Sequence, residues 1–178
     1  MRKALLIGTT GMLAEAAGEM AADAGKSVLA ARHASAFRFG NLRLDASLRK
    51  IDADYARPSR FLGLIRPEAP FDMALTWIRP QAEELRNALA RMMAKDALLV
   101  EVMGSGASRP GGFADKRAKA MRLFPHIRYA QVILGFVIEN GKSRWLTHEE
   151  ISAAAIKAIR SGAPRTIAGR LEPWEKRP

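Results

Sequence analysis

The sequence predicts an α/β fold: a doubly wound, predominantly parallel sheet of six or seven strands with helices on both faces. Short apolar segments alternate along the chain with segments of helical periodicity, the order typical of parallel strands joined by crossover helices. The apolar segments are short unbroken runs, as expected of strands buried on both faces. No linker, repeat or low-complexity tract divides the chain, so we expect residues 1–178 to form one domain.

The stretch Lys3–Ala14, K-A-L-L-I-G-T-T-G-M-L-A, is the one around which this fold is organised. The apolar run 4–7 predicts the first strand. Gly8, Gly11 and Ala14 follow at intervals of three residues, where a helical pattern begins. The first glycine permits a tight turn, the second lets the backbone approach a pyrophosphate, and the small third residue lets the helix press against the strand. Free N–H groups at the helix start favour an anion. The stretch therefore predicts a dinucleotide phosphate site, the alternative being an ordinary turn without a ligand.

The remaining elements follow from apolar runs and helix signals. The helix 147–160 is the clearest, because Thr147 and Glu150 have the spacing of a capping box and Gly162 follows as a stop. Further predicted helices are 14–24, the neighbourhood of 61–65, 80–94 and 113–123. Further predicted strands are 27–31, a segment around 42–45, 71–78, 97–103, 129–138 and the short 166–168.

Ligands of such a sheet bind outside the carboxyl ends of its strands. After the second predicted strand an NAD site usually carries an acid for the ribose 2′-hydroxyl, but this chain has Arg32 and His33 there. A guanidinium suits the 2′-phosphate of NADP, so we expect NADP rather than NAD. The ends of the first five strands supply the predicted cofactor-binding residues: Gly8, Thr9, Thr10, Gly11, Met12, Leu13, Arg32, His33, Asp45, Ala46, Trp77, Ile78, Gly104 and Ser105.

The composition excludes some classes of site and partner. The chain has no cysteine and no H-x-x-x-H motif or carboxylate cluster, so we expect no disulfide and no metal site. It shows no signal peptide and no apolar stretch long enough for a bilayer, so we expect a cytoplasmic protein without a membrane partner. The net charge of +11 favours anionic partners. The densest basic segment, 116–128, holds few aromatic residues, which favours a solvated surface over a nucleic-acid site.

These segments together resemble the short-chain dehydrogenase/reductase superfamily, with its Rossmann-type three-layer fold. The opening G-T-T-G-M-L-A is similar to the G-x-x-G-x-x-A/G motif of the family. The segment L-G-F-V at 134–137 is similar to its P-G-F/W-V segment, which usually lies near the nicotinamide. The resemblance implies that Asp45 contacts the adenine, that 76–78 replace the N-A-G segment of the family, and that Ser105 stands where the family carries its catalytic serine.

The proton-transfer machinery of that family is missing from this sequence. The family uses a tyrosine whose pKa is lowered by a lysine four residues on. Tyr55 is followed by A-R-P-S and Tyr129 by A-Q-V-I, and the segment between the fifth and sixth strands leaves little room for a long catalytic helix. The catalytic residues are therefore unknown. The substitutes to consider are Ser105 and Tyr129, with Ser108 and His126 behind them, although a loop serine is commonly a turn former.

Three functions are compatible with these observations. The first is an NADP(H)-binding protein of short-chain dehydrogenase type that reduces or oxidises a small carbonyl or alcohol through a non-standard active site. The second is an NADP(H)-binding sensor or regulatory protein without catalysis, which the absent Y-x-x-x-K motif favours. The third is a basic nucleic-acid-binding domain, whose affinity would fall steeply with salt. The tail 171–178 contains a tryptophan between charged residues; packing on the chain itself and a homo-oligomer contact both suit it.

Overall fold

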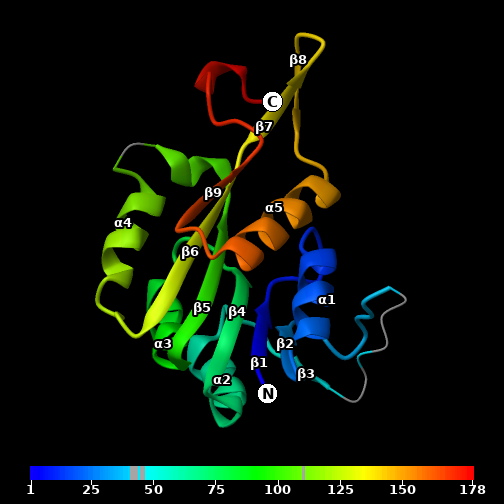
Figure 1. Ribbon diagram of the computed structural model, residues 1–178, viewed down its shortest axis with the longest axis vertical. Helices are drawn as coiled ribbons and strands as arrows, with labels where there is room; N and C mark the ends of the chain where they lie inside the picture. The colour runs from blue at the N-terminus through cyan, green and yellow to red at the C-terminus, as the bar shows by residue number, and fades with distance from the viewer. Residues whose placement is uncertain (41–43, 45–46, 110) are drawn as a thin grey trace.

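A seven-stranded parallel sheet forms the centre of the molecule (Figure 1). The structure is a computed structural model that describes residues 1–40, 44, 47–109 and 111–178. The strand order is β3-β2-β1-β4-β5-β6-β9, and every neighbouring pair is parallel. Helices cover both faces, which confirms the predicted doubly wound α/β fold.

The strands of the sheet are β1 (Lys3–Ile7), β2 (Lys26–Ala31), β3 (Leu48–Asp52), β4 (Phe71–Trp77), β5 (Met93–Met103), β6 (Ile127–Leu134) and β9 (Arg165–Ala168). A separate antiparallel pair consists of β7 (Phe136–Glu139) and β8 (Lys142–Trp145). The helices are α1 (Ala14–Asp23), α2 (Pro58–Ile65), α3 (Glu83–Arg91), α4 (Phe113–Met121) and α5 (His148–Ser161). Three short 3-10 segments are η1 (Arg66–Glu68), η2 (Ser105–Ser108) and η3 (Trp174–Lys176).

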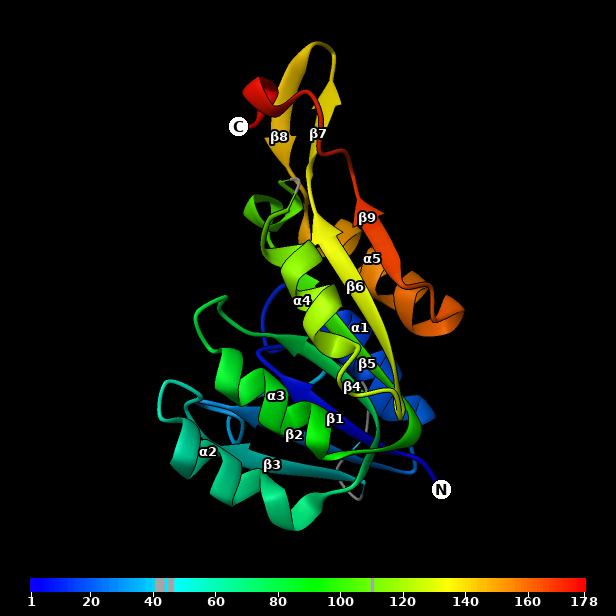
Figure 2. The same cartoon turned by 90° about the vertical axis from the view of Figure 1, so that its left-hand side faces the viewer.

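The strand β1 contributes to the hydrophobic cores on both faces of the sheet. Leu6 belongs to the core shared with α1 and α5, whereas Leu5 and Ile7 belong to the core shared with α2 and α3. Figure 2 shows these two pairs of helices on opposite faces of the sheet. Two buried faces explain why β1 is an unbroken apolar run. The strand pairs with β2 on one side and β4 on the other, so the strand order reverses at β1. In open α/β sheets the ligand crevice lies at this switch point.

The third strand lies later in the sequence than predicted. Leu44 lies outside any strand, and the strand runs from Leu48 to Asp52. The predicted cofactor positions Asp45 and Ala46 lie outside the described residues. β3 forms one edge of the sheet and Ile51 is its one buried residue, so its sequence L-R-K-I-D shows little apolar signal. The L-R-L segment before it is more apolar and therefore gives the stronger strand signal.

The predicted sixth strand, 129–138, is two strands in the structure. The first strand, β6, pairs in parallel with β9 as far as Leu134. The second strand, β7, begins at Phe136 and pairs with β8 in a hairpin that extends beyond the sheet (Figure 1). Between them, an added Cβ at Gly135 would clash with the Arg170 carbonyl oxygen of the returning tail. The hairpin turn places Asn140 and Gly141 at φ +51 and +76, as a type I′ turn requires. The dipeptide Asn-Gly at this position is a sequence signal for a hairpin.

The helix α5 begins with the predicted capping box and braces the turn before α1. The Thr147 side chain accepts from the Glu150 N–H, the Glu150 carboxylate accepts from the Thr147 N–H, and Gly162 ends the helix at φ +63. Farther along α5, the Ser152 hydroxyl donates to the Met12 carbonyl oxygen at 3.0 Å. The first turn of α1 is therefore held from behind by α5.

Protonation of Glu150 is expected to weaken the start of α5. Hydrogen bonds from Arg144 and from the Thr147 N–H lower the pKa of Glu150 to about 2. A carboxyl group whose pKa is lowered by folding stabilises the folded protein at pH values above its ordinary pKa, here 4.5. This stabilisation is lost as the pH falls toward the folded-state pKa of about 2. The urea concentration that unfolds half of the wild-type protein should therefore fall across this pH range. In Glu150→Gln, which lacks the carboxyl group, it should fall less steeply. Glu175→Gln, in the exposed tail, should leave the decline as in the wild type; equal slopes for both variants would contradict the assignment.

Candidate functional site

A cleft of about 940 Å³ opens at the switch point of the sheet. Its walls come from the segments that follow β1, β2, β3 and β4, so it lies outside the carboxyl ends of four neighbouring strands. Its volume lies within the range of small-molecule and cofactor sites, about 300–1,000 Å³. The lining residues are Gly8, Thr10, Ala30, Ala31, Arg32, His33, Ala53, Asp54, Tyr55, Ala56, Pro58, Trp77, Arg79, Gln81 and Ala82.

The cleft brings together only some of the residues predicted from the sequence. Gly8, Thr10, Arg32, His33 and Trp77 line it. Gly11 is exposed at the turn between β1 and α1 and is not among the lining residues. A second group takes other positions: the side chains of Thr9, Leu13 and Ile78 are buried, Met12 packs against the core shared by α1 and α5, and Gly104 and Ser105 lie at the end of β5.

The turn from β1 into α1 leaves space and donors for an anion. Gly8 has φ +69, and an added Cβ there would clash with the Trp77 carbonyl oxygen, so this position requires glycine. An added Cβ at Gly11 meets no heavy atom within 4 Å. In the described part of the chain, the N–H groups of Gly11, Met12 and Leu13 donate no hydrogen bond. These features fit a diphosphate group at the turn.

A further observation at the same turn agrees with this fit. No side chain caps the N-terminus of α1. Helix N-termini carry unsatisfied N–H groups that need a capping group, water or a ligand. The donors of this turn are therefore free for an incoming oxygen atom.

Arg32, at the end of β2, places a positive charge at the cleft. The nearby carboxylates of Asp52 and Asp54 accept hydrogen bonds from other residues. Arg32 is exposed and lines the cleft. The Asp52 carboxylate accepts from the Ser35 N–H at 2.8 Å and from its hydroxyl at 2.7 Å, and these bonds lower the pKa of Asp52. The Asp54 carboxylate accepts from the Ala56 N–H at 2.9 Å. Asp52 ends β3 and Asp54 follows it, so a third strand predicted too early in the sequence could not place either acid at this edge.

The C-terminal tail covers the serine at the end of β5. Arg177 donates to the Ser105 hydroxyl at 2.7 Å, and its guanidinium lies 4.1 Å from the centre of the Trp174 ring. Arg109 approaches the same ring at 4.7 Å. The tail runs beside the hairpin β7–β8 (Figure 2). Ser105 therefore contacts the tail of its own chain and does not line the cleft.

Solved structures resemble this chain although no protein-family model and no curated protein matches it. One is a bulky-bulky ketone specific alcohol dehydrogenase from Comamonas testosteroni, with TM-score 0.64, 15% identity, and coverage of 98% of this chain and 89% of that chain. Another is a putative β-ketoacyl-ACP reductase, with TM-score 0.66, 18% identity, and coverage of 94% and 96%. A third is BdcA in complex with NADPH, with TM-score 0.65, 12% identity, and coverage of 96% of both chains.

The fold is that of the short-chain dehydrogenases/reductases. Structures described as members of this family, including one from Serratia marcescens, align over more than nine-tenths of both chains. Identities of 12–18% establish the common architecture and do not carry over any residue's role. The activity of this chain must therefore be argued from its own residues.

Tyr129 is held in a buried charged network away from the cleft. Its hydroxyl donates to the Glu101 carboxylate at 2.5 Å. Burial and the charge of Glu101 raise the pKa of Tyr129 well above its ordinary value. The tyrosine that serves as acid/base in the short-chain dehydrogenase family needs the opposite shift. The environment of Tyr129 therefore does not equip it for proton transfer.

The same network holds the loop that forms one wall of the cleft. Glu101 is buried and pairs with Arg86 and with Arg117, the latter at 3.1 Å. The Arg86 guanidinium also donates to the carbonyl oxygens of Ile78, Arg79 and Pro80, which follow β4. Arg86 thus ties this loop to β5. This network is not among the sites predicted from the sequence, although the sequence holds one signal of it: a single charge within the apolar run L-L-V-E-V-M.

Metal and membrane sites are not evident in the ranges that the structure describes. No group of three or more histidine, aspartate or glutamate side chains could hold a metal ion in these ranges. Among the same residues, no helix combines the length and the apolar character that crossing a bilayer requires.

Glu101→Gln should destabilise the protein strongly. It leaves two buried arginines without a counter-charge, and removing one partner of a buried ion pair costs about 3–5 kcal/mol. Urea unfolding should show this loss. Glu139→Gln breaks a solvent-exposed pair with Arg144 and should cost at most about 1 kcal/mol. If the two variants lost equal stability, the buried network would not be what holds this region together.

Proposed function

We propose that the chain binds NADP(H) in the cleft at the carboxyl ends of β1–β4. The free amides at the turn into α1 support this proposal most directly, because they are the groups that hold a pyrophosphate in dinucleotide sites. The open space at Gly11 lets the diphosphate approach. Arg32 then takes the 2′-phosphate, and no acid stands beside it after β2 for a ribose hydroxyl. The similarity to BdcA, solved with NADPH, is consistent with this cofactor.

We infer that the bound cofactor serves a sensor or regulatory role. Both tyrosines lack the family's lysine, Tyr129 donates its hydroxyl to Glu101, and Ser105 is engaged by Arg177. The residues that would replace the missing acid/base are therefore occupied.

The second candidate is a reductase or dehydrogenase of a small carbonyl or alcohol. Its support is the similarity to structures named as dehydrogenases and reductases, including a carbonyl reductase from Pseudomonas aeruginosa. In this case the tail must leave Ser105 before a substrate reaches it. Consumption of NADPH with any member of a panel of small aldehydes and ketones would favour this candidate. Tight NADPH binding with no consumption across the panel would favour the sensor.

Gly11→Val should abolish dinucleotide binding while leaving the fold intact. The added side chain fills the space that the diphosphate needs, but its Cβ meets no protein atom within 4 Å. Calorimetry should show at least a tenfold loss of NADPH affinity, an unfavourable change of about 1.4 kcal/mol or more. Gly63→Val is the matched control, because Gly63 also has open space around its Cβ but lies in α2, outside the turn between β1 and α1. Unchanged NADPH affinity in Gly11→Val would contradict the placement of the diphosphate.

Arg32→Glu should reverse the cofactor preference. A hydrogen bond to a charged group contributes about 1.5–3 kcal/mol, so losing the guanidinium and gaining a carboxylate should weaken NADPH binding about tenfold to hundredfold. NADH, which has no 2′-phosphate, should be affected far less. The two affinities are measured on one sample by competition with a fluorescent nucleotide. Arg122→Glu, at the exposed end of α4, controls for the change in net charge. An equal loss for both cofactors would refute the role of Arg32.

A further inference from the structure

The C-terminal residues 172–178 form a strap over the segment that follows β5. Before the strap, the Arg170 N–H donates to the Phe136 carbonyl oxygen at 2.9 Å and the Phe136 N–H donates to the Arg170 carbonyl oxygen at 3.0 Å. Leu171 packs against the small core that includes Met103. The strap itself contains η3, which has no buried residue. The chain is therefore anchored as far as Leu171, and the strap is attached at that point.

Two side chains of the strap hold it on the molecule. In the part of the chain that the structure describes, the one hydrogen bond from the strap to the rest of the protein runs from Arg177 to the Ser105 hydroxyl, at 2.7 Å. The Arg177 guanidinium also lies 5.7 Å from the centre of the Trp145 ring. The second side chain is Trp174, whose ring lies 4.7 Å from the Arg109 guanidinium. Cation–π contacts between exposed side chains are individually weak, so few weak contacts keep the strap in place.

The hairpin β7–β8 supplies one side of the position that the strap occupies. Trp145 ends β8 and is 48% exposed, which is a large exposed fraction for an indole. Both views show the tail beside this hairpin (Figures 1 and 2). The hairpin adds no strand to the central sheet. Its contact with Arg177 therefore gives it a role as the docking face of the strap.

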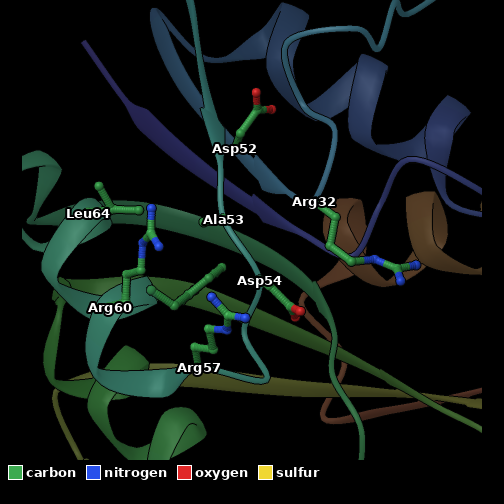
Figure 3. Close-up of a pocket in the computed structure, with 8 residues that line it drawn as sticks. Arg32, Asp52, Ala53, Asp54, Arg57, Arg60 and Leu64 are labelled. Carbon is green, nitrogen blue, oxygen red and sulfur yellow. The ribbon is translucent and has the colours of Figure 1, made fainter.

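The strap lies outside the open cleft but at the same edge of the sheet. Among the described residues, those that line the cleft follow β1 to β4, and none of them belongs to the strap or to η2. At the other end of the cleft, Arg32 points away from Arg57 and Arg60 of α2 (Figure 3). Because β4 and β5 are parallel neighbours, their carboxyl ends lie side by side. The strap therefore covers the continuation of the cleft toward β5.

A bound dinucleotide would need the space toward β5. Dinucleotides lie across the crevice at the switch point of the sheet, with the diphosphate at the turn after the first strand. If the adenosine half lies at the ends of β2 and β3, the nicotinamide half extends in the opposite direction, toward the ends of β4 and β5. Ser105 begins the segment after β5, and Arg177 contacts it there. The strap and the nicotinamide half thus compete for one space.

We propose that residues 172–178 are a displaceable strap that closes the nicotinamide half of the crevice, with Arg177 as its latch on Ser105 and Trp145. The inference rests on the proposed NADP(H) function and adds regulation to it. A ligand that consists of the adenosine half alone binds with the strap closed, whereas NADP(H) binds with the strap open. Binding of NADP(H) thus releases the tail at the surface, which provides a sensor with an output.

The test is calorimetric titration of the full chain with NADPH and with 2′,5′-ADP, which represents the adenosine half. Arg177→Ala removes the latch, so its NADPH affinity should rise at least about threefold, because the apparent Kd falls as the binding-competent fraction grows. Its affinity for 2′,5′-ADP should equal that of the wild type. Lys176→Ala, which removes the neighbouring exposed cation, is the matched control and should leave both affinities unchanged.

A second measurement follows the strap in the unmutated chain. The protein has three tryptophans, Trp77 at the cleft and Trp145 and Trp174 at the strap, so fluorotryptophan labelling gives one fluorine resonance for each. Saturation with NADPH should shift the resonances of Trp145 and Trp174. Saturation with 2′,5′-ADP should leave both unchanged. This measurement does not depend on the folding of any variant.

The outcomes separate the strap from the proposed function. If the wild type binds NADPH but Arg177→Ala binds it no more tightly, the strap is overturned and the proposed function stands. An equal rise in affinity for NADPH and 2′,5′-ADP, or resonances of Trp145 and Trp174 that NADPH does not shift, overturns the strap in the same way. No binding of either ligand to the wild type or to Arg177→Ala overturns both proposals.

Discussion

The tight turn between β1 and α1 is the constraint on which the cleft depends. β1 is buried on both faces between β2 and β4, so its chain leaves the sheet where little room remains. Gly8 makes the exit feasible through its positive φ, beside the Trp77 carbonyl. The turn does not use its own N–H groups. Ser152 of α5 holds it from behind by donating to the Met12 carbonyl and accepting from the Ala16 N–H at 3.4 Å. The N–H groups of Gly11, Met12 and Leu13 thus remain available to a ligand, because the contacts with Ser152 hold the loop in place.

The buried network around Glu101 is the second support of the cleft, and it bears on function. Burying charges is costly unless they are paired and hydrogen-bonded, and here one carboxylate meets two guanidinium groups and a phenol. One of them, Arg117, comes from α4, the nine-residue helix between β5 and β6. The resemblance to short-chain dehydrogenases implies a longer catalytic helix in this segment. In this chain the segment supplies a structural ion pair, which favours binding without proton transfer.

Local patterns predicted most of the fold, and the errors have physical causes. β1, β2, β4 and β5 are buried strands, so their apolar runs were visible in the sequence. β3 is an edge strand with charged residues, and its displacement also hid Asp52 and Asp54. Other features depend on residues far apart in the chain: Arg177 contacts Ser105 across 72 positions, and Arg160 contacts Glu19 across 141. No local pattern specifies such contacts. The hairpin was predictable in principle, because Asn140-Gly141 is a strong turn signal.

The most direct test of the account is amide hydrogen exchange of the turn between β1 and α1, measured with and without saturating NADPH. The amides of Gly11, Met12 and Leu13 have no acceptor in the described chain, and a bound diphosphate would supply one. NADPH is expected to slow exchange at these amides. The segment η1 (Arg66–Glu68), which precedes β4 and therefore lies at the amino-terminal edge of the parallel sheet, should show no comparable change. NADPH binding that leaves exchange in this turn unchanged would contradict the account.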